Sequence, residues 1–421
     1  MFPPLHAPTQ MPRNLSTLAP LARPTAGARA RRFLFCTNEC VGLGHMRRTL
    51  TLASAVRRRD PNASALVLTG APLAPGLSLP AGVDTVKLPM LERDPVGGLG
   101  ARNLGIGSGD VHELRASLAL AAATAFAPDV AVIDKLPLGL GGELEPALRA
   151  LRASGTRIVL GLRDVEEDPV MVRRRWRAMD AREALQGYYD SILVYGPEGG
   201  AADALSCVGW TDLAATVHRV GYIGAPLPTE APADLPTEYV LGTVGGGADG
   251  FPVLAALIDA VRERPLAMPV VVVAGPLMDP AEVKELRRRA EGLAVRLFEA
   301  RPDMDAVVAG ARGVVAMAGY NTVAEITRAG HPAVLVPRVG PSAEQLIRAR
   351  ALVDDGGFAM IHPDDLTPQR MADELAAMLR RPRPAYDPAE HCGAAVAADI
   401  LVALADRAPD ATRTQALAIA G

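Results

Sequence analysis

The sequence predicts an α/β fold of two domains in tandem, each built on a parallel β-sheet. Short apolar runs alternate with amphipathic segments along most of the chain, which is the order of parallel strands covered by helices. The β-branched run Val270–Val273 is typical of a strand that is buried on both faces. With 421 residues, the chain is too long for one compact core and suits two domains.

Composition excludes several classes of protein. The formal charge of -3 gives no electrostatic case for nucleic-acid binding, and 4% aromatic residues argue against a protein that stacks single-stranded bases. No apolar run approaches the roughly 18–20 residues that span a bilayer. The cysteines are scattered without a metal-binding or disulfide pattern, so we expect free thiols in a cytoplasmic protein; they are Cys36, Cys40, Cys207 and Cys392.

The first domain is expected over residues 32–221, after a disordered tail at residues 1–31 that is rich in Pro, Ala and Arg. Residues 94–110 are rich in glycine and lack periodicity, so they are predicted to form a mobile loop or lid. A helix begins near His45, and its arginines, Arg47 and Arg48 among them, are expected to point mostly outward. The predicted strands are 32–37, 65–68, 84–88, 130–133, 157–160 and 191–195, and the later helices are 111–125, 143–154 and 171–185.

A proline-rich linker, residues 222–237, leads to the second domain at residues 238–388. A last helix is expected over residues 389–406, followed by a tail at 407–421. The predicted strands of the second domain are 239–244, 270–274, 295–298, 314–317, 333–336 and 359–361, and its helices are 251–261, 280–290, 304–309, 323–329, one beginning after Glu344-Gln345, and 368–379.

A glycine loop, Gly245 to Gly250, joins a predicted strand to a predicted helix. Glycine lets the backbone approach a ligand closely, and the unpaired N–H groups of the helix start favour a diphosphate. A tight turn without a ligand is the alternative. The loop also fits the dinucleotide pattern Gly-x-Gly-x-x-Gly, but that pattern requires an acid after the next strand, where residues 274–276 are Ala-Gly-Pro. The first domain lacks this acid too, since its second strand ends in Thr69-Gly70, so NAD is disfavoured.

Polar residues follow two strands of the second domain, at the sheet edge where parallel sheets bind ligands. Asn321, Thr322 and Glu325 follow one strand, and Glu344 and Gln345 follow the next. Glu325 either closes a capping box with Thr322 or accepts both hydroxyls of a ribose. Glu344 and Gln345 either bind sugar hydroxyls or cap a helix.

The first domain offers a candidate base. His45 stands at a helix start after a glycine turn, where a neutral imidazole suits a general base, although a structural histidine is the alternative. Asp134, Arg163 and Asp164 end two strands and are expected to face the same cleft, unless Arg163 and Asp164 pair with each other.

Together these residues resemble the GT-B glycosyltransferases close to family 28, which include the enzyme that adds N-acetylglucosamine to the lipid-linked peptidoglycan precursor and the diacylglycerol glucosyltransferases. The resemblance covers most of residues 32–400 and is strongest where residues 318–326 (AGYNTVAEI) precede Gly-x-Pro-Ala-Val-Leu-Val-Pro and then Glu344-Gln345. Residues 42–45 (Gly-Leu-Gly-His) look like the family's glycine turn that ends in a histidine. Residues 134–139 and 161–164 look more like an uncharacterised, predicted-transferase branch.

The resemblance implies two Rossmann-like domains facing across a cleft, with the last helix crossing back to the first domain. It implies that a sugar moves with inversion from a nucleoside diphosphate, for which we expect UDP, to a hydroxyl of an unidentified acceptor, with no metal or other cofactor. His45 would be the base, with Asp134 or Glu39 as its orienting acid. Glu325 would hold the ribose. The implied donor-binding residues are Gly245, Gly246, Gly247, Phe298, Met304, Gly319, Asn321, Thr322, Glu325, Glu344 and Gln345, and the implied acceptor-side residues are Gly42, Gly44, Lys135, Arg163 and Asp164.

Other functions stay open at this point: a nucleotide-sugar 2-epimerase of the same architecture, a dinucleotide-dependent enzyme, and a non-catalytic nucleotide-sugar-binding protein. Asp303 and Asp305 match the spacing of a metal-diphosphate pair, but two acids near a helix start are common. Peripheral contact with the inner face of a membrane through Arg173–Arg177, which includes Trp176, is weighed against a solvated helix face, and the nearby Asp180 and Glu183 favour the latter.

Overall fold

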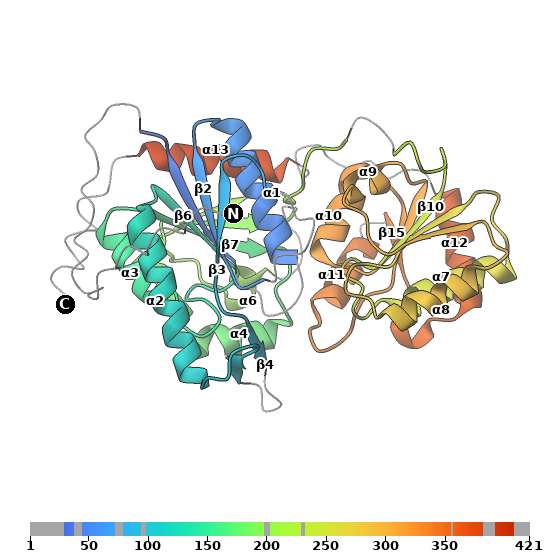
Figure 1. The fold of residues 1–421 in the computed structure, drawn as a ribbon, viewed down its shortest axis with the longest axis horizontal. Coiled ribbons are helices and arrows are strands. Elements are labelled where there is room, and N and C mark those ends of the chain that lie inside the picture. Colours follow the sequence, from blue (N-terminus) through green and yellow to red (C-terminus); the bar gives the residue numbers. More distant parts are fainter. Residues whose placement is uncertain are drawn as a thin grey trace, which may run out of the picture.

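The computed structural model describes residues 29–37, 44–71, 79–93, 98–197, 203–228, 232–354, 357–381 and 392–407. These residues form two α/β lobes side by side, joined by the segment that follows β9 (Figure 1). Both predicted tails lie almost wholly outside the described residues, as do Glu39, Cys40 and Gly42. The remaining cysteines, Cys36, Cys207 and Cys392, are free thiols, as expected.

In the described part of the amino-terminal lobe, seven parallel strands form one sheet in the order β3-β2-β1-β6-β7-β8-β9, and β4 and β5 form a separate antiparallel pair. The strands are β1 (Arg32–Cys36), β2 (Ser64–Thr69), β3 (Val83–Lys87), β4 (Leu91–Arg93), β5 (Leu99–Ala101), β6 (Val130–Asp134), β7 (Arg157–Arg163), β8 (Ser191–Tyr195) and β9 (Thr216–Arg219). The helices are α1 (Gly44–Arg59), α2 (Ser108–Phe126), α3 (Glu145–Ala153), α4 (Pro169–Ala178), α5 (Ala181–Tyr188) and α6 (Ala204–Val208).

The carboxyl-terminal lobe holds a second parallel sheet, whose described strands run in the order β12-β11-β10-β13-β14-β15. These strands are β10 (Val240–Thr243), β11 (Val270–Val273), β12 (Val295–Phe298), β13 (Gly313–Ala316), β14 (Ala333–Leu335) and β15 (Phe358–Met360). The helices of this lobe are α7 (Phe251–Glu263), α8 (Pro280–Ala290), α9 (Met304–Ala309), α10 (Tyr320–Ala329), α11 (Glu344–Asp354), the short 3₁₀ helix η2 (Pro363–Asp365) and α12 (Pro368–Arg380). The last helix of the described residues is α13 (Gly393–Asp406).

Both faces of each sheet are covered, and this explains the unbroken apolar runs of the sequence. In β1, Phe33 and Phe35 face one core cluster while Leu34 and Cys36 face another, because successive side chains of a strand point to opposite faces. A strand between two helical layers therefore needs apolar residues at every position. The predicted α/β fold of two parallel-sheet domains is confirmed.

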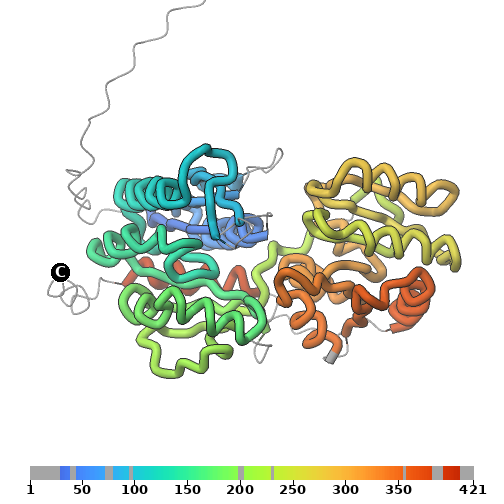
Figure 2. The backbone as a smooth tube through the Cα atoms, turned by 90° about the horizontal axis from the view of Figure 1, so that it is seen from below, coloured from blue at the N-terminus to red at the C-terminus, as the bar shows by residue number. Residues whose placement is uncertain are grey.

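The helix α13 belongs to the carboxyl-terminal part of the sequence but packs in the amino-terminal lobe. It lies against α1 (Figures 1 and 2), with Ala394, Ala397, Ala398 and Leu401 buried. Gly393 at its start touches the backbone carbonyls of residues 221 and 222, where a side chain would not fit. The chain therefore passes between the lobes twice.

Several predicted boundaries are wrong for local reasons. The single helix expected at 171–185 is two helices, because Asp180 adopts a left-handed conformation (φ 48°) between α4 and α5. Trp176 of α4 and Ala181 of α5 are both buried and stand five residues apart, a spacing that breaks helical periodicity. The predicted loop at 94–110 contains the strand β5 and the first turn of α2. Short elements α6 and β9 had not been predicted.

A buried ion pair joins the two lobes. The guanidinium of Arg348, on α11, donates to both carboxylate oxygens of Asp164 in the other lobe, each at 2.8 Å, and also to the carbonyl of Ala318 at 2.9 Å. The Arg348 side chain is only 1% exposed. Nearby, the Glu167 carboxylate accepts from the backbone N–H of Ala343 at 2.8 Å. These contacts fix the lobes at the inner edge of both sheets.

Replacing Arg348 with Met should strongly destabilise the protein, because it leaves the Asp164 charge buried without its cation. We expect the free energy of unfolding to fall by about 3–5 kcal/mol, measured by urea denaturation. Arg350→Met is the matched control, since Arg350 is exposed on the same helix, and it should change stability by less than about 0.5 kcal/mol. Equal effects of the two substitutions would contradict a structural role for the buried pair.

Candidate functional site

His45 is the second residue of α1, and its side chain faces the carboxyl end of strand β6. Its Nδ1 atom is hydrogen-bonded to the carboxylate of Asp134, the last residue of β6. Asp134 is buried, so the carboxylate holds the imidazole in one orientation. Nε2 makes no hydrogen bond to any residue in the described part of the chain, which leaves it as the ring atom that can accept a proton. Of the two acids expected to orient His45, Asp134 does so, and Glu39 lies outside the described residues.

Arg48 completes this cluster, although the sequence analysis placed it on the outer face of α1. Its side chain is 3% exposed, and its Nη2 atom donates to Asp134 Oδ1 at 2.6 Å. The outward prediction was wrong because Arg48 is one turn before Leu52, on the buried stripe of the helix. The i, i+3 spacing from His45 was the signal that could have found it.

Burial sets the charge state of this cluster. Removal from water lowers the pKa of His45 below its ordinary value, although the carboxylate of Asp134 opposes this effect. The pKa of Asp134 is held well below its usual range, because Arg48 and His45 offset the cost of burial. Since Arg48 carries the positive charge that balances Asp134, the imidazole is neutral near pH 7, which is the form a general base requires.

The glycine loop after β10 is tightly packed against the end of β11. Gly245 and Gly247 have positive φ angles of 63° and 94°, which favour glycine. A Cβ on Gly247 would collide with the carbonyl oxygen of Ala274, so packing alone accounts for that glycine. Gly246 is under no such constraint, and a Cβ on Gly245 would lie 3.8 Å from Thr322 Oγ1 in the first turn of α10. The loop and the start of α10 are therefore neighbours.

The helix α10 begins at Tyr320, three residues earlier than predicted, with Gly319 as its cap. Thr322 is thus inside the first turn, and no side chain caps the helix. The capping-box interpretation of Thr322 and Glu325 is wrong. The Asn321 side chain instead reaches across to the other lobe, where its Nδ2 donates to the carbonyl of Gly44 at 3.0 Å. The start of α10 and the start of α1 therefore meet, next to His45.

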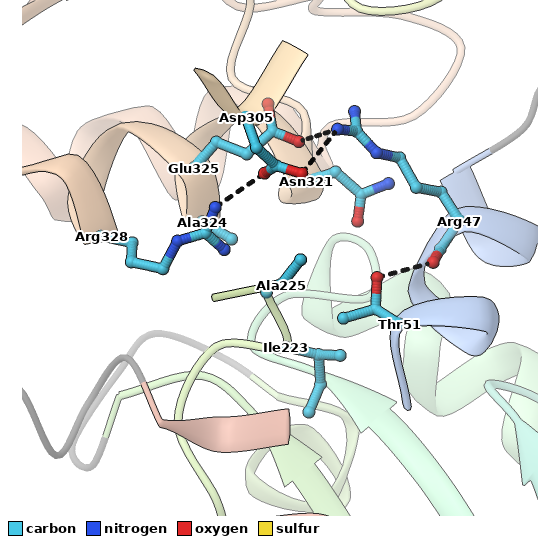
Figure 3. A pocket seen from close by; sticks show the side chains of 10 residues that line it. Arg47, Thr51, Ile223, Ala225, Asp305, Asn321, Ala324, Glu325 and Arg328 are labelled. Carbon is cyan, nitrogen blue, oxygen red and sulfur yellow. Dashed lines mark hydrogen bonds and ion pairs between the residues drawn. The ribbon is translucent and has the colours of Figure 1, made fainter. Parts of the chain in front are cut away.

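Glu325 lines a small pocket between α10 and α1 (Figure 3). Its carboxylate pairs with Arg47 of the other lobe at 2.8 Å, and Arg47 also lies 3.8 Å from Asp305. The Glu325 side chain is 8% exposed, and burial raises its pKa to about 6. Asp305 pairs with Arg328 at 2.7 Å and Asp303 with Arg301 at 2.7 Å, so arginines hold both acids that had been weighed as a metal pair.

Glu344 and Gln345 stand at the start of α11, as predicted, but each is already bonded. Glu344 pairs with Arg163 of the other lobe at 2.7 Å, and this partner holds the Glu344 pKa well below its usual range despite burial. The Gln345 side-chain oxygen accepts from the backbone N–H of Arg338 at 3.1 Å. Arg163 also pairs with Glu166 at 3.1 Å, and Lys135 lies 3.6 Å from Glu166.

Arg163 and Asp164 do not pair with each other, so that alternative is wrong. Arg163 bonds Glu166 and Glu344, while Asp164 bonds Arg348. Lys135 has a positive φ of 70°, a conformation that non-glycine residues adopt rarely and that is concentrated at functional sites. The residues that end β6 and β7 do face the same interlobe region, as the sheet topology predicted.

The loop expected to border a nucleobase runs from the end of β12 to the start of α9. Phe298 is half-buried, and the Arg301 guanidinium lies 4.8 Å from its ring centre. Arg301 in turn bonds Asp234 and Asp303. Met304, the first residue of α9, is also half-buried, so both side chains remain partly accessible.

Trp176 cannot take part in the proposed membrane contact. Its side chain is buried and its ring centre lies 5.7 Å from that of Trp210. Arg173, Arg174 and Arg177 are exposed on the same helix. Within the described ranges, no helix is long and apolar enough to cross a membrane.

The carboxyl-terminal part of the chain is similar to known proteins. Residues 243–402 match the family model described as the glycosyltransferase family 28 C-terminal domain. Over 164 residues, the chain is 33% identical to the UDP-N-acetylglucosamine--N-acetylmuramyl-(pentapeptide) pyrophosphoryl-undecaprenol N-acetylglucosamine transferase of Rhodopseudomonas palustris (strain HaA2). This matched stretch is 38% of this chain and 43% of that protein. The protein of the same name from Mycobacterium bovis (strain BCG / Pasteur 1173P2) is 36% identical over 107 residues, 24% of this chain and 25% of that protein. The chain thus spans less than half the length of these curated relatives.

Solved structures resemble most of the chain at lower identity. MurG from Acinetobacter baumannii has a TM-score of 0.52 and 15% identity, covering 92% of this chain and 98% of that one. The glycotransferase of kitacinnamycin has a TM-score of 0.57 and 17% identity, covering 93% and 99%. At these identities the likeness establishes the fold alone.

The fold is therefore GT-B, two Rossmann-like domains that face each other, as the sequence predicted. On this fold the carboxyl-terminal part matches the family 28 model, and the predicted resemblance to that family is confirmed.

The carboxylates Glu325 and Glu344 should affect stability in opposite directions. The pKa of Glu325 is raised from 4.5 to about 6, so its ionisation on going from pH 4.5 to above pH 6 costs about 2 kcal/mol. Glu325→Gln should therefore raise the free energy of unfolding at pH 7.5, and the gain should shrink at pH 4.5.

The pKa of Glu344 is lowered, so the stabilisation that this carboxylate contributes is present above its unfolded pKa. Glu344→Gln should destabilise the protein at pH 7.5. Urea denaturation at both pH values tests the pair, and a loss of stability in Glu325→Gln at pH 7.5 would mean that Arg47 fully offsets burial.

Proposed function

We propose that this protein is an inverting glycosyltransferase, which moves a sugar from a UDP-sugar to an acceptor hydroxyl without a metal ion. One observation carries the proposal: the His45–Asp134 pair stands at the start of α1, where Gly44 is hydrogen-bonded to Asn321 at the start of α10. A candidate base of one lobe is thereby apposed to a helix amino terminus of the other, which is the arrangement that transfer from a diphosphate requires.

The donor would lie along the carboxyl-terminal lobe. The N–H groups at the start of α10 and the adjoining backbone of Gly245 and Gly246 would receive the diphosphate. Glu325 would accept the ribose hydroxyls, and the segment from Phe298 to Met304 would border the base. Glu344 and Gln345 would bind hydroxyls of the sugar. UDP is favoured because the relatives in sequence are named UDP-N-acetylglucosamine transferases, and one structural neighbour is described as complexed with UDP-2fluoro-glucose.

His45 would act from the opposite side of the sugar. Its Nε2 takes the proton of the acceptor hydroxyl while the hydroxyl oxygen attacks the anomeric carbon. The bond from that carbon to the diphosphate oxygen breaks in the same step, and the diphosphate leaves with the electron pair. A single displacement inverts the anomeric configuration. The helix terminus and the glycine loop stabilise the charge on the leaving group, so that no metal is required.

Donor binding would act on the ion pairs between the lobes. Glu325 is paired with Arg47 and Glu344 with Arg163, and both arginines come from the amino-terminal lobe. A sugar nucleotide that uses these carboxylates replaces the arginines or adds to their hydrogen bonds. The amino-terminal lobe would thus respond to an occupied donor site.

A direct test is the release of UDP from a panel of UDP-sugars, with and without a broad set of acceptors. Acceptor-dependent release of UDP supports the proposal. Formation of a 2-epimer without acceptor would instead identify an epimerase, and UDP binding without any turnover would identify a binding protein.

Glu325→Ala should weaken UDP binding by ~1–3 kcal/mol, because the ribose hydroxyls lose their charged acceptor. Isothermal titration calorimetry measures the effect. Glu285→Ala is the control, since Glu285 lies on α8 and pairs with Arg288 and Arg289 of that helix. If the two variants bind UDP equally well, the ribose role of Glu325 is wrong.

His45→Ala should abolish transfer while UDP affinity stays the same, because the base acts on the acceptor. Since burial lowers the pKa of His45, wild-type turnover should be constant through neutral pH and fall only below about pH 6.5, as the imidazole gains a proton. His218→Ala is the control, because His218 lies on the edge strand β9. Wild-type turnover in His45→Ala would dismiss the base.

A further inference from the structure

We propose that Arg48 is a positioning residue of this reaction, which fixes Asp134 against His45 and itself packs beside Tyr320 of the donor lobe, so that a neutral imidazole is presented in one tautomer. The role of Arg48 in catalysis rests on the glycosyl transfer proposed above. The inference about Arg48 stands on contacts that hold whether or not the acceptor is known.

Arg48 lies against both partners of the histidine–carboxylate pair and donates to the carboxylate, while its contact with the protonated Nδ1 of His45 is a close approach and not a hydrogen bond. Its Nη2 atom lies 2.6 Å from Asp134 Oδ1, 2.9 Å from Asp134 Oδ2 and 3.0 Å from His45 Nδ1. A guanidinium is permanently charged, and here its one atom Nη2 donates to both carboxylate oxygens, so Arg48 orients the carboxylate. Asp134 can then accept from the N–H of His45 Nδ1, and the proton-accepting lone pair is on Nε2.

The charge balance around His45 explains why an arginine is needed. Among the described residues, three charged groups act on the imidazole: Asp134 from β6, Arg48 from its own helix and Arg163 from β7. The rings of Tyr195, from β8, and Tyr320, from α10, lie beside the Arg48 guanidinium. Without Arg48, a buried carboxylate beside the ring would favour a proton on it, and a protonated histidine cannot act as a base. With Arg48 in place, Asp134 is already neutralised, and a second positive charge on the ring is unfavourable.

The same arginine contacts the donor lobe. The Arg48 guanidinium lies 5.1 Å from the ring centre of Tyr320, and that of Arg348 lies 5.8 Å from the same ring. The Tyr320 hydroxyl accepts from the backbone N–H of Ile223 at 2.9 Å, in the segment that connects the lobes. Tyr320 is the first residue of α10, the helix assigned to the diphosphate. The position of the candidate base is therefore coupled to that of the donor-binding helix.

Titration of His45 by NMR tests the inference without any transfer assay. Protein with ¹⁵N-labelled histidine is titrated from pH 5 to pH 9, and the His45 signals are assigned by their loss in His45→Asn. We expect a neutral ring with hydrogen on Nδ1 at pH 7 in the wild type. In Arg48→Gln the titration should move to higher pH, raising the protonated fraction at pH 7 by on the order of fivefold. Arg48→Lys keeps the charge and should titrate as the wild type does.

Arg152→Gln is the matched control. Arg152 is a buried arginine of the same lobe whose contacts to Asp190, at 3.0 Å, are remote from His45. It should lower the melting temperature and leave the His45 titration unchanged. An unchanged titration in Arg48→Gln, or an equal shift in Arg48→Lys, would overturn the inference. If Arg48→Gln does not fold, the wild type and Arg48→Lys still decide it, because a protonated His45 at pH 7 in the wild type contradicts the charge argument.

Failure of the inference and failure of the proposed function give different results. The His45 titration can behave as expected in a protein that transfers no sugar. Conversely, the protein can transfer sugar even if the His45 titration does not depend on Arg48. Where turnover is found, Arg48→Gln should lose activity more at pH 6 than at pH 8. A purely structural arginine would lower activity equally at both pH values.

Discussion

The ring centre of Tyr320 lies 5.1 Å and 5.8 Å from the guanidinium groups of two arginines that come from different lobes, and the architecture of the site depends on these contacts. Arg48 bonds Asp134 and Arg348 bonds Asp164, and these two acids stand at the ends of the neighbouring strands β6 and β7. The parallel sheet thus brings two carboxylates to one edge, and each carboxylate holds one cation against the same ring. Because both cations are buried, separating the lobes would expose charge that is now paired, and the lobes are held in register.

The candidate donor-binding acids differ in how well the protein accommodates them. Glu344 is stabilised by Arg163, whereas the contact of Glu325 with Arg47 does not offset its burial, since its pKa is raised. A buried acid that is costly to ionise is more often found at a functional site than in a structural ion pair. Arg47 is also 42% exposed, so this partner is free to move when a ligand arrives, while Arg163 is held by Glu166 as well.

The fold could be predicted because it depends on local patterns that the sequence carries directly. Almost every element of both sheets could be predicted from three patterns: strands of pure apolar character, glycine at helix ends, and alternation of strand with helix. Errors arose where a single residue decides, as at Asp180, or where a helix begins without a capping side chain, as at Tyr320. His45 and Asp134 could be nominated because parallel topology collects strand ends at one edge. The pairs Arg47–Glu325, Arg163–Glu344 and Asp164–Arg348 could not, because partners so far apart in sequence leave no local pattern.

The return of α13 to the amino-terminal lobe has a consequence for biosynthesis. That helix covers α1, and the apolar side chains beneath it belong to a core that begins with β1. During translation the first lobe emerges early, but the helix that seals it leaves the ribosome only after the entire second lobe. The second lobe can therefore complete its own core first. Until α13 is synthesised, the first lobe exposes an apolar face, which makes it prone to aggregation and a target for chaperones.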